Sequence, residues 1–297
     1  MKYYLLLISI KKKQRKVKSL NVFTTQSEYE KFLNGSAPTF PTISYCSADG
    51  KCHVNSVPSV TIAIDVLNVD EPTIVCTSHR NVSSIIIDKV EQDTISTAYT
   101  FSNIGEHTVK FILNTYALED GMFANKDNYV NIKKIKISSS VVRIGKECFL
   151  GCPLIKDIVI PKNIMYIEDG AFLSCKNLSS VSLPKSLLRI DSNLFYKCVK
   201  LSDVNIPKDV TMIGENAFHQ CTSLSTINIP SKVTMIGDNA FYFCGALKAI
   251  YISAFIPPKL GDNVFEGTSC PIYVPNVSID AYKSNWGQYS ERIKGNE

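Results

Sequence analysis

Cysteine is the residue type in this chain whose number and spacing could support chemistry. The chain has ten cysteines in 297 residues, enough for a disulfide framework or a zinc site. Residues at equivalent positions of a repeating coil stack along an axis, whereas a tetrahedral metal site needs ligands that converge on one point. Five cysteines are therefore predicted to be buried free thiols that act as small apolar side chains, because they recur every 23 residues: Cys152, Cys175, Cys198, Cys221 and Cys244. No metal and no cofactor is expected.

Two other cysteines are placed differently. Cys46 and Cys52 flank a short segment that contains Asp49 and Gly50, a pair typical of hairpin turns. A turn there would set the two cysteines opposite each other. The sequence therefore leaves both a disulfide and two free thiols open at this pair.

Histidines offer the other candidate for chemistry. His53 is expected on the solvated face of a strand, and His79 and His107 on loops. Neither His79 nor His107 has a serine or cysteine partner in a recognisable catalytic setting, and ladders of like residues do not bring an acid, a base and a nucleophile to one pocket. We therefore predict that the protein is not an enzyme, with no catalytic residues.

The elements that position these residues belong to a repeat of 23 residues, clearest from Ile144 to Cys244. Each copy has two short extended segments with inward aliphatic side chains, a proline after the first segment, and a closing Phe element. The closing phenylalanines are Phe149, Phe172, Phe195, Phe218 and Phe241. A fixed period in the low twenties with alternating aliphatics predicts a mainly β leucine-rich-repeat solenoid of about seven coils.

The outward positions of the first extended segment vary from coil to coil. One row consists of Lys136, Val159, Ser182, Asn205, Asn228 and Tyr251, and the next row includes Asp157 and Asp203. We expect these side chains to form a largely polar sheet face, which is the candidate surface for a protein or glycan ligand. The alternative is that the face is merely solvated.

Five segments are predicted in chain order. Residues 1–20 are a basic and apolar N-terminal segment, 21–57 a short helix from Thr25 plus a hairpin, and 58–114 a small immunoglobulin-like antiparallel β-sandwich, because apolar runs recur there about every 10–12 residues. Residues 115–275 form the solenoid. Residues 276–297 form a capping helix that starts at Ser278 and carries Trp286 and Ile293 on its apolar face.

Charge is concentrated at the N-terminus. Seven of the 32 lysines and arginines fall in the first twenty residues, so the formal net charge of +5 becomes −2 for the rest of the chain. A nucleic-acid partner is therefore not expected on the solenoid, although the basic segment could touch phosphate or anionic lipid. The apolar run from Tyr3 to Ile10 is too short for a transmembrane span, and it does not have the pattern of a signal peptide.

The repeat, as it stands from Leu224 to Cys244, resembles the BspA-type (Treponema pallidum-like) leucine-rich repeat of surface proteins in Bacteroidetes and some protozoan parasites. The resemblance covers about residues 115–297, and the segment from Ala98 to Lys110 is similar to a lead-in module found before such repeats. It implies a cell-surface or secreted adhesin that binds host matrix proteins or other cells, here expected as a monomer. The stretch from Thr25 to Val54 is similar to modules of phage tail proteins, so a virion-associated receptor-binding component is the alternative.

Overall fold

The computed structural model describes residues 44–46, 52–54, 57–125 and 131–296 of the chain. The predicted segment 1–20 and the predicted helix from Thr25 lie outside these residues. The expected hairpin is present, since β1 (Ser44–Cys46) pairs antiparallel with β2 (Cys52–Val54) and sets Cys46 opposite Cys52 in register.

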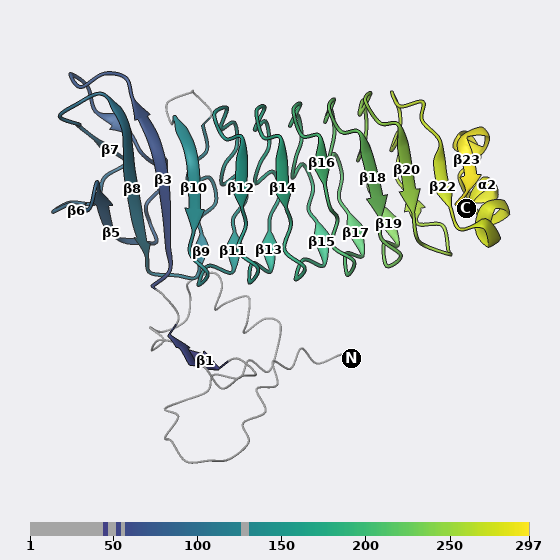
Figure 1. The fold of residues 1–297 in the computed structure, drawn as a ribbon, viewed down its shortest axis with the longest axis horizontal. Coiled ribbons are helices and arrows are strands. Elements are labelled where there is room, and N and C mark those ends of the chain that lie inside the picture. Colours follow the sequence, from purple (N-terminus) through teal and green to yellow (C-terminus); the bar gives the residue numbers. More distant parts are fainter. Residues whose placement is uncertain (1–43, 47–51, 55–56, 126–130, 297) are drawn as a thin grey trace, which may run out of the picture.

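The body of the molecule is a stack of short strands that lie side by side along its long axis (Figure 1). Its N-terminal elements are β3 (Ser59–Val66), β4 (Thr73–Ile74), β5 (Val82–Ile87), β6 (Val90–Glu91), β7 (Ala98–Tyr99) and β8 (Gly105–Leu113). The first strand of successive coils is β10 (Ile132–Ile137), β12 (Asp157–Val159), β14 (Ser180–Ser182), β16 (Asp203–Val204), β18 (Thr226–Ile229), β20 (Ala249–Ile252) and β22 (Ile272–Val274). The second strand is β9 (Ala117–Leu118), β11 (Arg143–Ile144), β13 (Tyr166–Ile167), β15 (Arg189–Ile190), β17 (Met212–Ile213), β19 (Met235–Ile236) and β21 (Lys259–Leu260).

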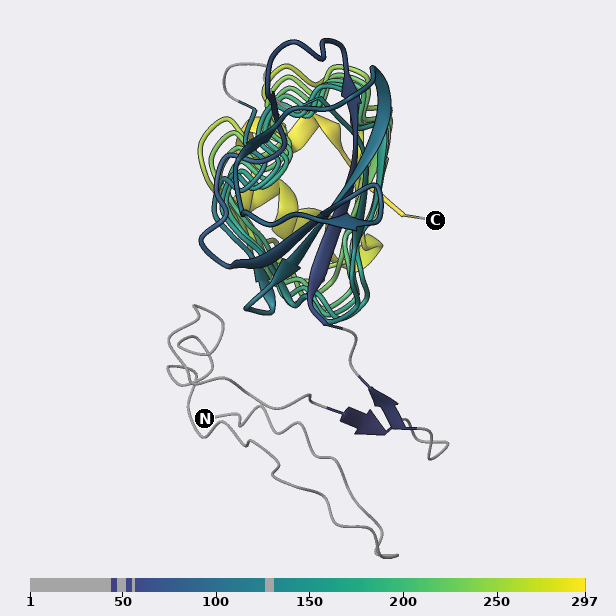
Figure 2. The ribbon, with the colours of Figure 1, turned by 90° about the vertical axis from the view of Figure 1, so that its left-hand side faces the viewer.

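The coils confirm the predicted solenoid. Within each sheet, first strands pair in parallel with first strands and second strands with second strands, and the sheets are divided between β16 and β18 and between β13 and β15. The partner of a residue in the central coils lies 23 positions along the chain, as for Asp157, Ser180 and Asp203. Figure 2, a view along the solenoid, shows the coils superposed. A residue type repeated with this period therefore becomes a column that runs the length of the molecule.

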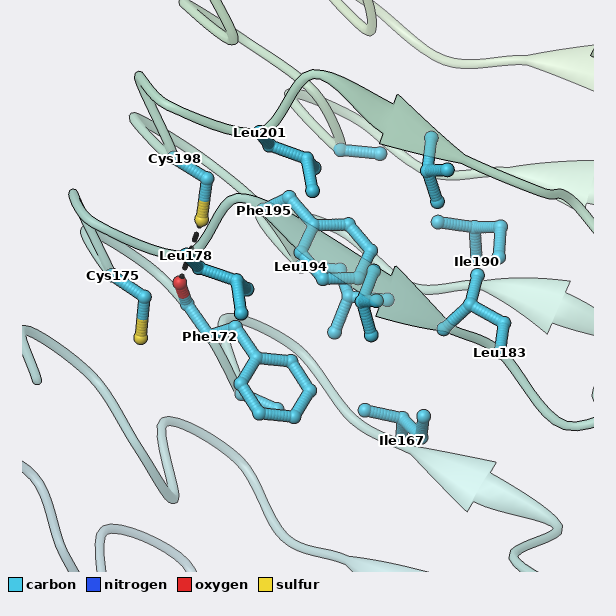
Figure 3. Packing of buried hydrophobic residues seen from close by; sticks show 14 of the residues in the cluster. Ile167, Phe172, Cys175, Leu178, Leu183, Ile190, Leu194, Phe195, Cys198 and Leu201 are labelled. Carbon is cyan, nitrogen blue, oxygen red and sulfur yellow. Dashed lines mark hydrogen bonds between the residues drawn. The ribbon is translucent and has the colours of Figure 1, made fainter. Parts of the chain in front are cut away.

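A column of phenylalanine rings fills the centre of the coils (Figure 3). Phe172 and Phe195 are fully buried, and their ring centroids are 5.8 Å apart with nearly parallel planes. The same stacking continues from coil to coil with centroids 5.1–5.6 Å apart, through Phe123, Phe149, Phe218, Phe241 and Phe265. Offset stacks of this kind add attraction to the burial of apolar area, so each coil stabilises its neighbours.

The cysteines form a second buried column. Each of the five repeat thiols donates a hydrogen bond to the phenylalanine carbonyl of the preceding coil, as from Cys198 Sγ to the Phe172 oxygen over 3.1 Å (Figure 3). The cysteines from Cys76 onward are free and buried. Burial raises the pKa of the Cys175 and Cys244 thiols to about 12, which keeps them protonated as donors and slow to react.

Each central coil closes through two residues with left-handed backbone. The first is Asn in four coils, and the second is the residue before the cysteine, such as Lys197 (φ 58°) or Gln220 (φ 56°). Asn tolerates this conformation, whereas a long side chain is disfavoured in it. A different constraint acts at Gly237, where an added Cβ would lie 2.6 Å from the Glu215 nitrogen of the preceding coil.

The antiparallel strands of residues 58–114 extend the sheet of the solenoid. β3 pairs antiparallel with β10 on one side and with β8 on the other, so the sheet and the hydrophobic core both cross the predicted boundary at residue 114. These strands are therefore continuous with the solenoid and do not form a self-contained sandwich. Their pairing covers the edge of β10, whose backbone groups would otherwise be unpaired. The buried carboxylate of Glu119 fixes this cap to the first coil by accepting hydrogen bonds from Ser78 Oγ and the Asn81 N–H.

His107 lies within β8, where the sequence predicted a loop. Its buried ring contacts Asp88 Oδ2 through Nδ1 (2.6 Å) and the Asn103 carbonyl through Nε2 (2.9 Å). Both partners are acceptors, so the ring satisfies both contacts as a cation. Burial acts to lower the pKa of His107, but the hydrogen bonds to Asp88 and Asn103 and the charge of Asp88 outweigh it and raise the pKa.

The C-terminal cap is a short helix followed by a strand. α2 (Ile279–Asn285) lies between η1 (Asn276–Ser278) and η2 (Gly287–Arg292), and β23 (Ile293–Gly295) pairs in parallel with β22. The predicted helix was expected to reach Ile293, but it ends before Gly287, a poor helix former. Trp286 is buried against Phe265 and donates from Nε1 to the Pro258 carbonyl over 3.0 Å. In the described residues, no helix has the length and apolarity to cross a membrane.

The left-handed positions predict a stabilising substitution. Gln220→Gly is expected to raise the free energy of unfolding by about 0.5–1 kcal/mol, because glycine adopts a positive φ without the cost that a side chain adds. Lys208→Gly is the control, since Lys208 is exposed and does not have a positive φ, and it should lower stability by about 0.5–1 kcal/mol. Denaturant unfolding measures both; equal effects of the two substitutions would contradict this account.

The His107 contacts predict a dependence of stability on pH. Because folding raises this pKa, the stabilisation is fully present below pH about 6.5 and is lost as pH rises through the folded-state pKa. Relative to His107→Gln, the parent should lose on the order of 1 kcal/mol between pH 6 and pH 9, a modest effect because Asp88 is half-exposed. Unfolding curves of both proteins at the two pH values provide the measurement, and parallel pH profiles would contradict a charged His107.

Candidate functional site

The sheet face built by the first strands carries the predicted candidate residues. Alternation along each strand turns Ile158 and Val181 inward and leaves the residues on either side of them exposed. Parallel register then aligns equivalent outward residues: Lys136 is paired with Val159, Val159 with Ser182, and Asn228 with Tyr251. The structure therefore aligns Lys136, Val159 and Ser182 in one sheet and Asn228 and Tyr251 in the next, while Asn205 directly follows β16 at the edge of the first sheet.

The candidate residues are all accessible. Val159 is 77% exposed and Tyr251 is 39% exposed. The other candidate residues are also exposed: Lys136, Ser182, Asn205, Asn228, Asp157 and Asp203. Asp157 and Asp203 share the second row with Ser180, which pairs with both. This second row ends at Ala249, which is buried. This face can make many separate contacts to an extended ligand.

The same face continues onto the antiparallel cap, which the sequence did not predict. Lys136 pairs with Thr61 of β3, and Thr61 pairs with Lys110 of β8. At this junction short side chains lie between long ones and leave a shallow hollow of about 320 Å³. Its polar lining consists of Thr61, Thr108, Lys134, Lys136 and Asp157, with Ala63 among its apolar atoms. The exposed alternation of Glu106, Thr108 and Lys110 was the signal in the sequence that could have located it.

The two ends of the face differ in chemistry. Lysines and carboxylates dominate near β10, where Lys134 Nζ lies 3.4 Å from Glu106 Oε1. Near the C-terminal cap the rings of Tyr251 and Tyr273 stack with centroids 5.1 Å apart, and Tyr273 pairs in register with Lys294. A ligand that follows the strand order would meet charged groups at one end and aromatic groups at the other.

Titratable groups elsewhere are arranged as structural contacts. Arg143 binds Glu168 and Asp120, Arg189 binds Asp191, and His219 stacks between Tyr196 and Tyr242. Burial and the nearby Lys197 lower the pKa of His219. Among the described residues, no group of three or more His, Cys, Asp or Glu side chains is placed to hold a metal ion.

The family of the chain follows from comparison of its repeats. A model of the BspA type leucine rich repeat region matches residues 72–193 and 143–271, with six copies. The chain belongs to the BspA-type leucine-rich repeat family. A comparison with curated proteins finds no match.

Solved structures with similarity to this BspA-type chain are bacterial leucine-rich repeat proteins. One from Bacteroides ovatus is 26% identical over 62% of this chain and 46% of its own, with a TM-score of 0.48. One from Eubacterium ventriosum is 28% identical over 47% of this chain and 37% of its own, with a TM-score of 0.42. A leucine rich cell surface protein from Faecalibacterium prausnitzii is 21% identical over 61% of this chain and 62% of its own, with a TM-score of 0.39. The chain thus matches less than half the length of the first two proteins.

Proposed function

We propose that this BspA-type chain is a non-enzymatic adhesion protein whose sheet face binds an extended protein or glycan. One observation carries the proposal: an accessible face built by the first strands runs from the cap over the coils, with side chains in register from Lys110 to Ser182 and again from Asn228 to Tyr273. Repeat proteins bind through faces of this kind, where many weak contacts add up along the axis. Equivalent residues diverge along that axis, so the face suits binding better than catalysis.

Location and assembly are part of the same proposal. The family resemblance supports display at the cell surface or secretion, with host matrix or cell-surface molecules as partners. We propose a monomer, because both ends of the coil stack are covered, by β3, β8 and β5 at one end and by α2, η2 and β23 at the other. Such caps remove the exposed ends through which solenoids would associate.

The virion-associated alternative rests on residues 25–54. Of these, the structure describes only the strands β1 and β2, and their pairing favours neither function. Cell fractionation separates the two proposals: recovery with the cell envelope or medium supports the adhesin, and recovery only with purified particles supports the virion component.

A pair of arginines on the face tests the binding proposal. The full-length chain and its variants are applied to immobilised matrix proteins and glycans. Asn205→Arg with Asn228→Arg should weaken the parent's binding at least tenfold, because both positions are exposed at the centre of the face. Exposed substitutions of this kind usually change stability by less than about 0.5 kcal/mol.

The matched control adds the same charge elsewhere. Gly245→Arg with Ala246→Arg lies on an exposed turn, and a Cβ added at Gly245 meets no atom within 4 Å. This control should bind within about twofold of the parent, because charges outside the centre of a binding surface change the affinity only slightly. Equal loss in both variants, or no binding by the parent to any member of the panel, would count against the sheet face as the binding surface.

A further inference from the structure

We propose that a ridge of lysines beside the sheet face binds a linear anionic polysaccharide that lies along the solenoid axis. The lysine ridge consists of Lys162, Lys185 and Lys208, with Lys232 at its C-terminal end. Each of the first three directly follows the proline that ends a first strand, so they occupy one position in three successive coils. All four side chains belong to exposed residues.

The geometry of the ridge follows from the coil register. Neighbouring strands lie about 4.8 Å apart, so the turns after β12, β14 and β16 place Lys162, Lys185 and Lys208 at regular steps of that size. Residues at equivalent positions of adjacent coils do meet across this gap: Lys232 Nζ lies 2.5 Å from Asp209 Oδ1, one coil earlier. The ridge is therefore a row of lysines whose backbone positions repeat from coil to coil along the axis.

The charge of the ridge is poorly compensated within the described part of the chain. There, neither Lys162 nor Lys185 has an ion pair, and Asp209 is the acid that contacts the ridge. The hydrogen bond from Lys232 and the charges of Lys232 and Lys208 lower the pKa of Asp209, which therefore stays ionised. Aligned like charges repel, and a polymer with anionic groups at regular intervals would remove that repulsion along the whole row. Because the chain beyond residue 20 has a net charge of −2, the ridge is a local concentration of positive charge.

The surroundings of the ridge favour a polysaccharide over a nucleic acid. At the positions that flank it in sequence, the exposed residues are Val159, Ser182 and Asn205 on the sheet side and Met165, Leu188 and Thr211 on the other. Hydroxyl and amide groups can hydrogen-bond sugar hydroxyls. Single-stranded nucleic acids are held by aromatic platforms that stack on the bases, and none of these neighbours is aromatic.

The test compares two triple substitutions in the full-length protein. Lys162→Gln, Lys185→Gln and Lys208→Gln remove the ridge, whereas Lys176→Gln, Lys200→Gln and Lys248→Gln remove the same charge from exposed lysines elsewhere on the coils. The probes are immobilised heparin as a sulfated linear polysaccharide, neutral dextran, and a single-stranded oligonucleotide. Binding is measured over a range of salt concentrations, after far-UV circular dichroism shows that each variant is folded.

The expected result is specific to the ridge. The ridge variant should bind heparin at least tenfold more weakly than the parent, with a shallower salt dependence by about 2 in the slope of log K against log salt, since about 0.7–0.9 is lost per neutralised contact. The control triple should bind within about twofold of the parent. Equal losses in the two triples would overturn the proposal, because general charge or the basic N-terminal segment would then explain binding. Tighter binding of the oligonucleotide, lost in the ridge variant, would also overturn it in favour of nucleic acid.

The ridge and the sheet face are separate proposals. The ridge variant leaves Asn205, Asn228 and Tyr251 unchanged, so its binding to matrix proteins on the panel should match that of the parent. Failure of heparin binding would remove the ridge proposal alone, while loss of panel binding only in the arginine variant of the face would still support the proposed function.

Discussion

The register of one coil on the next is the constraint on which the rest of this structure depends. A coil of 23 residues cannot bury its own apolar side chains, so it is stable only when its neighbours cover them. Equivalent positions therefore carry equivalent side chains, which gives a column of stacked phenylalanines and a column of thiols bonded to the preceding coil. The left-handed residues and the glycines at close backbone contacts recur for the same reason.

The two caps are consequences of that register. A stack of coils exposes a phenylalanine ring and a strand edge at each end, and both must be covered. At the N-terminal end Phe111 packs edge-on against Phe123, and β3 pairs with β10. At the C-terminal end Phe265 contacts Trp286 and Tyr289, and β23 extends the sheet. The caps also lengthen the outward face, so the need to close the core enlarges the surface that is open to ligands.

The sequence predicted what the period controls and missed what depends on contacts between non-repeated segments. Phe195 and Cys198 could be placed in the core because their spacing repeats, and Asn205 and Asn228 on the face because strands alternate. Nothing periodic indicates that β3 pairs with β10, so the continuation of the face onto Thr61 and Lys110 was not predicted. The sequence predicts a loop at His107 because Gly105 favours a turn, whereas pairing with β3 continues the strand through both residues. The helix predicted to reach Ile293 ends earlier, since the free edge of β22 recruits that residue as a strand.

Alternation within the strands, and not the length of the turns, holds the coils in register. The chain itself contains a turn with one additional residue, between β20 and β21, after which Met235 still pairs with Lys259. The direct test is to insert one alanine after Ile227, within β18 (Thr226–Ile229), or after Ser231, within the following turn, and to compare thermal unfolding. An insertion in a strand turns every later side chain of that strand to the other face. The account predicts that the turn insertion keeps a cooperative transition within a few degrees of the parent, because its effect on stability should be as small as that of a surface substitution. It predicts that the strand insertion abolishes cooperative unfolding. Two variants that unfold alike would contradict it.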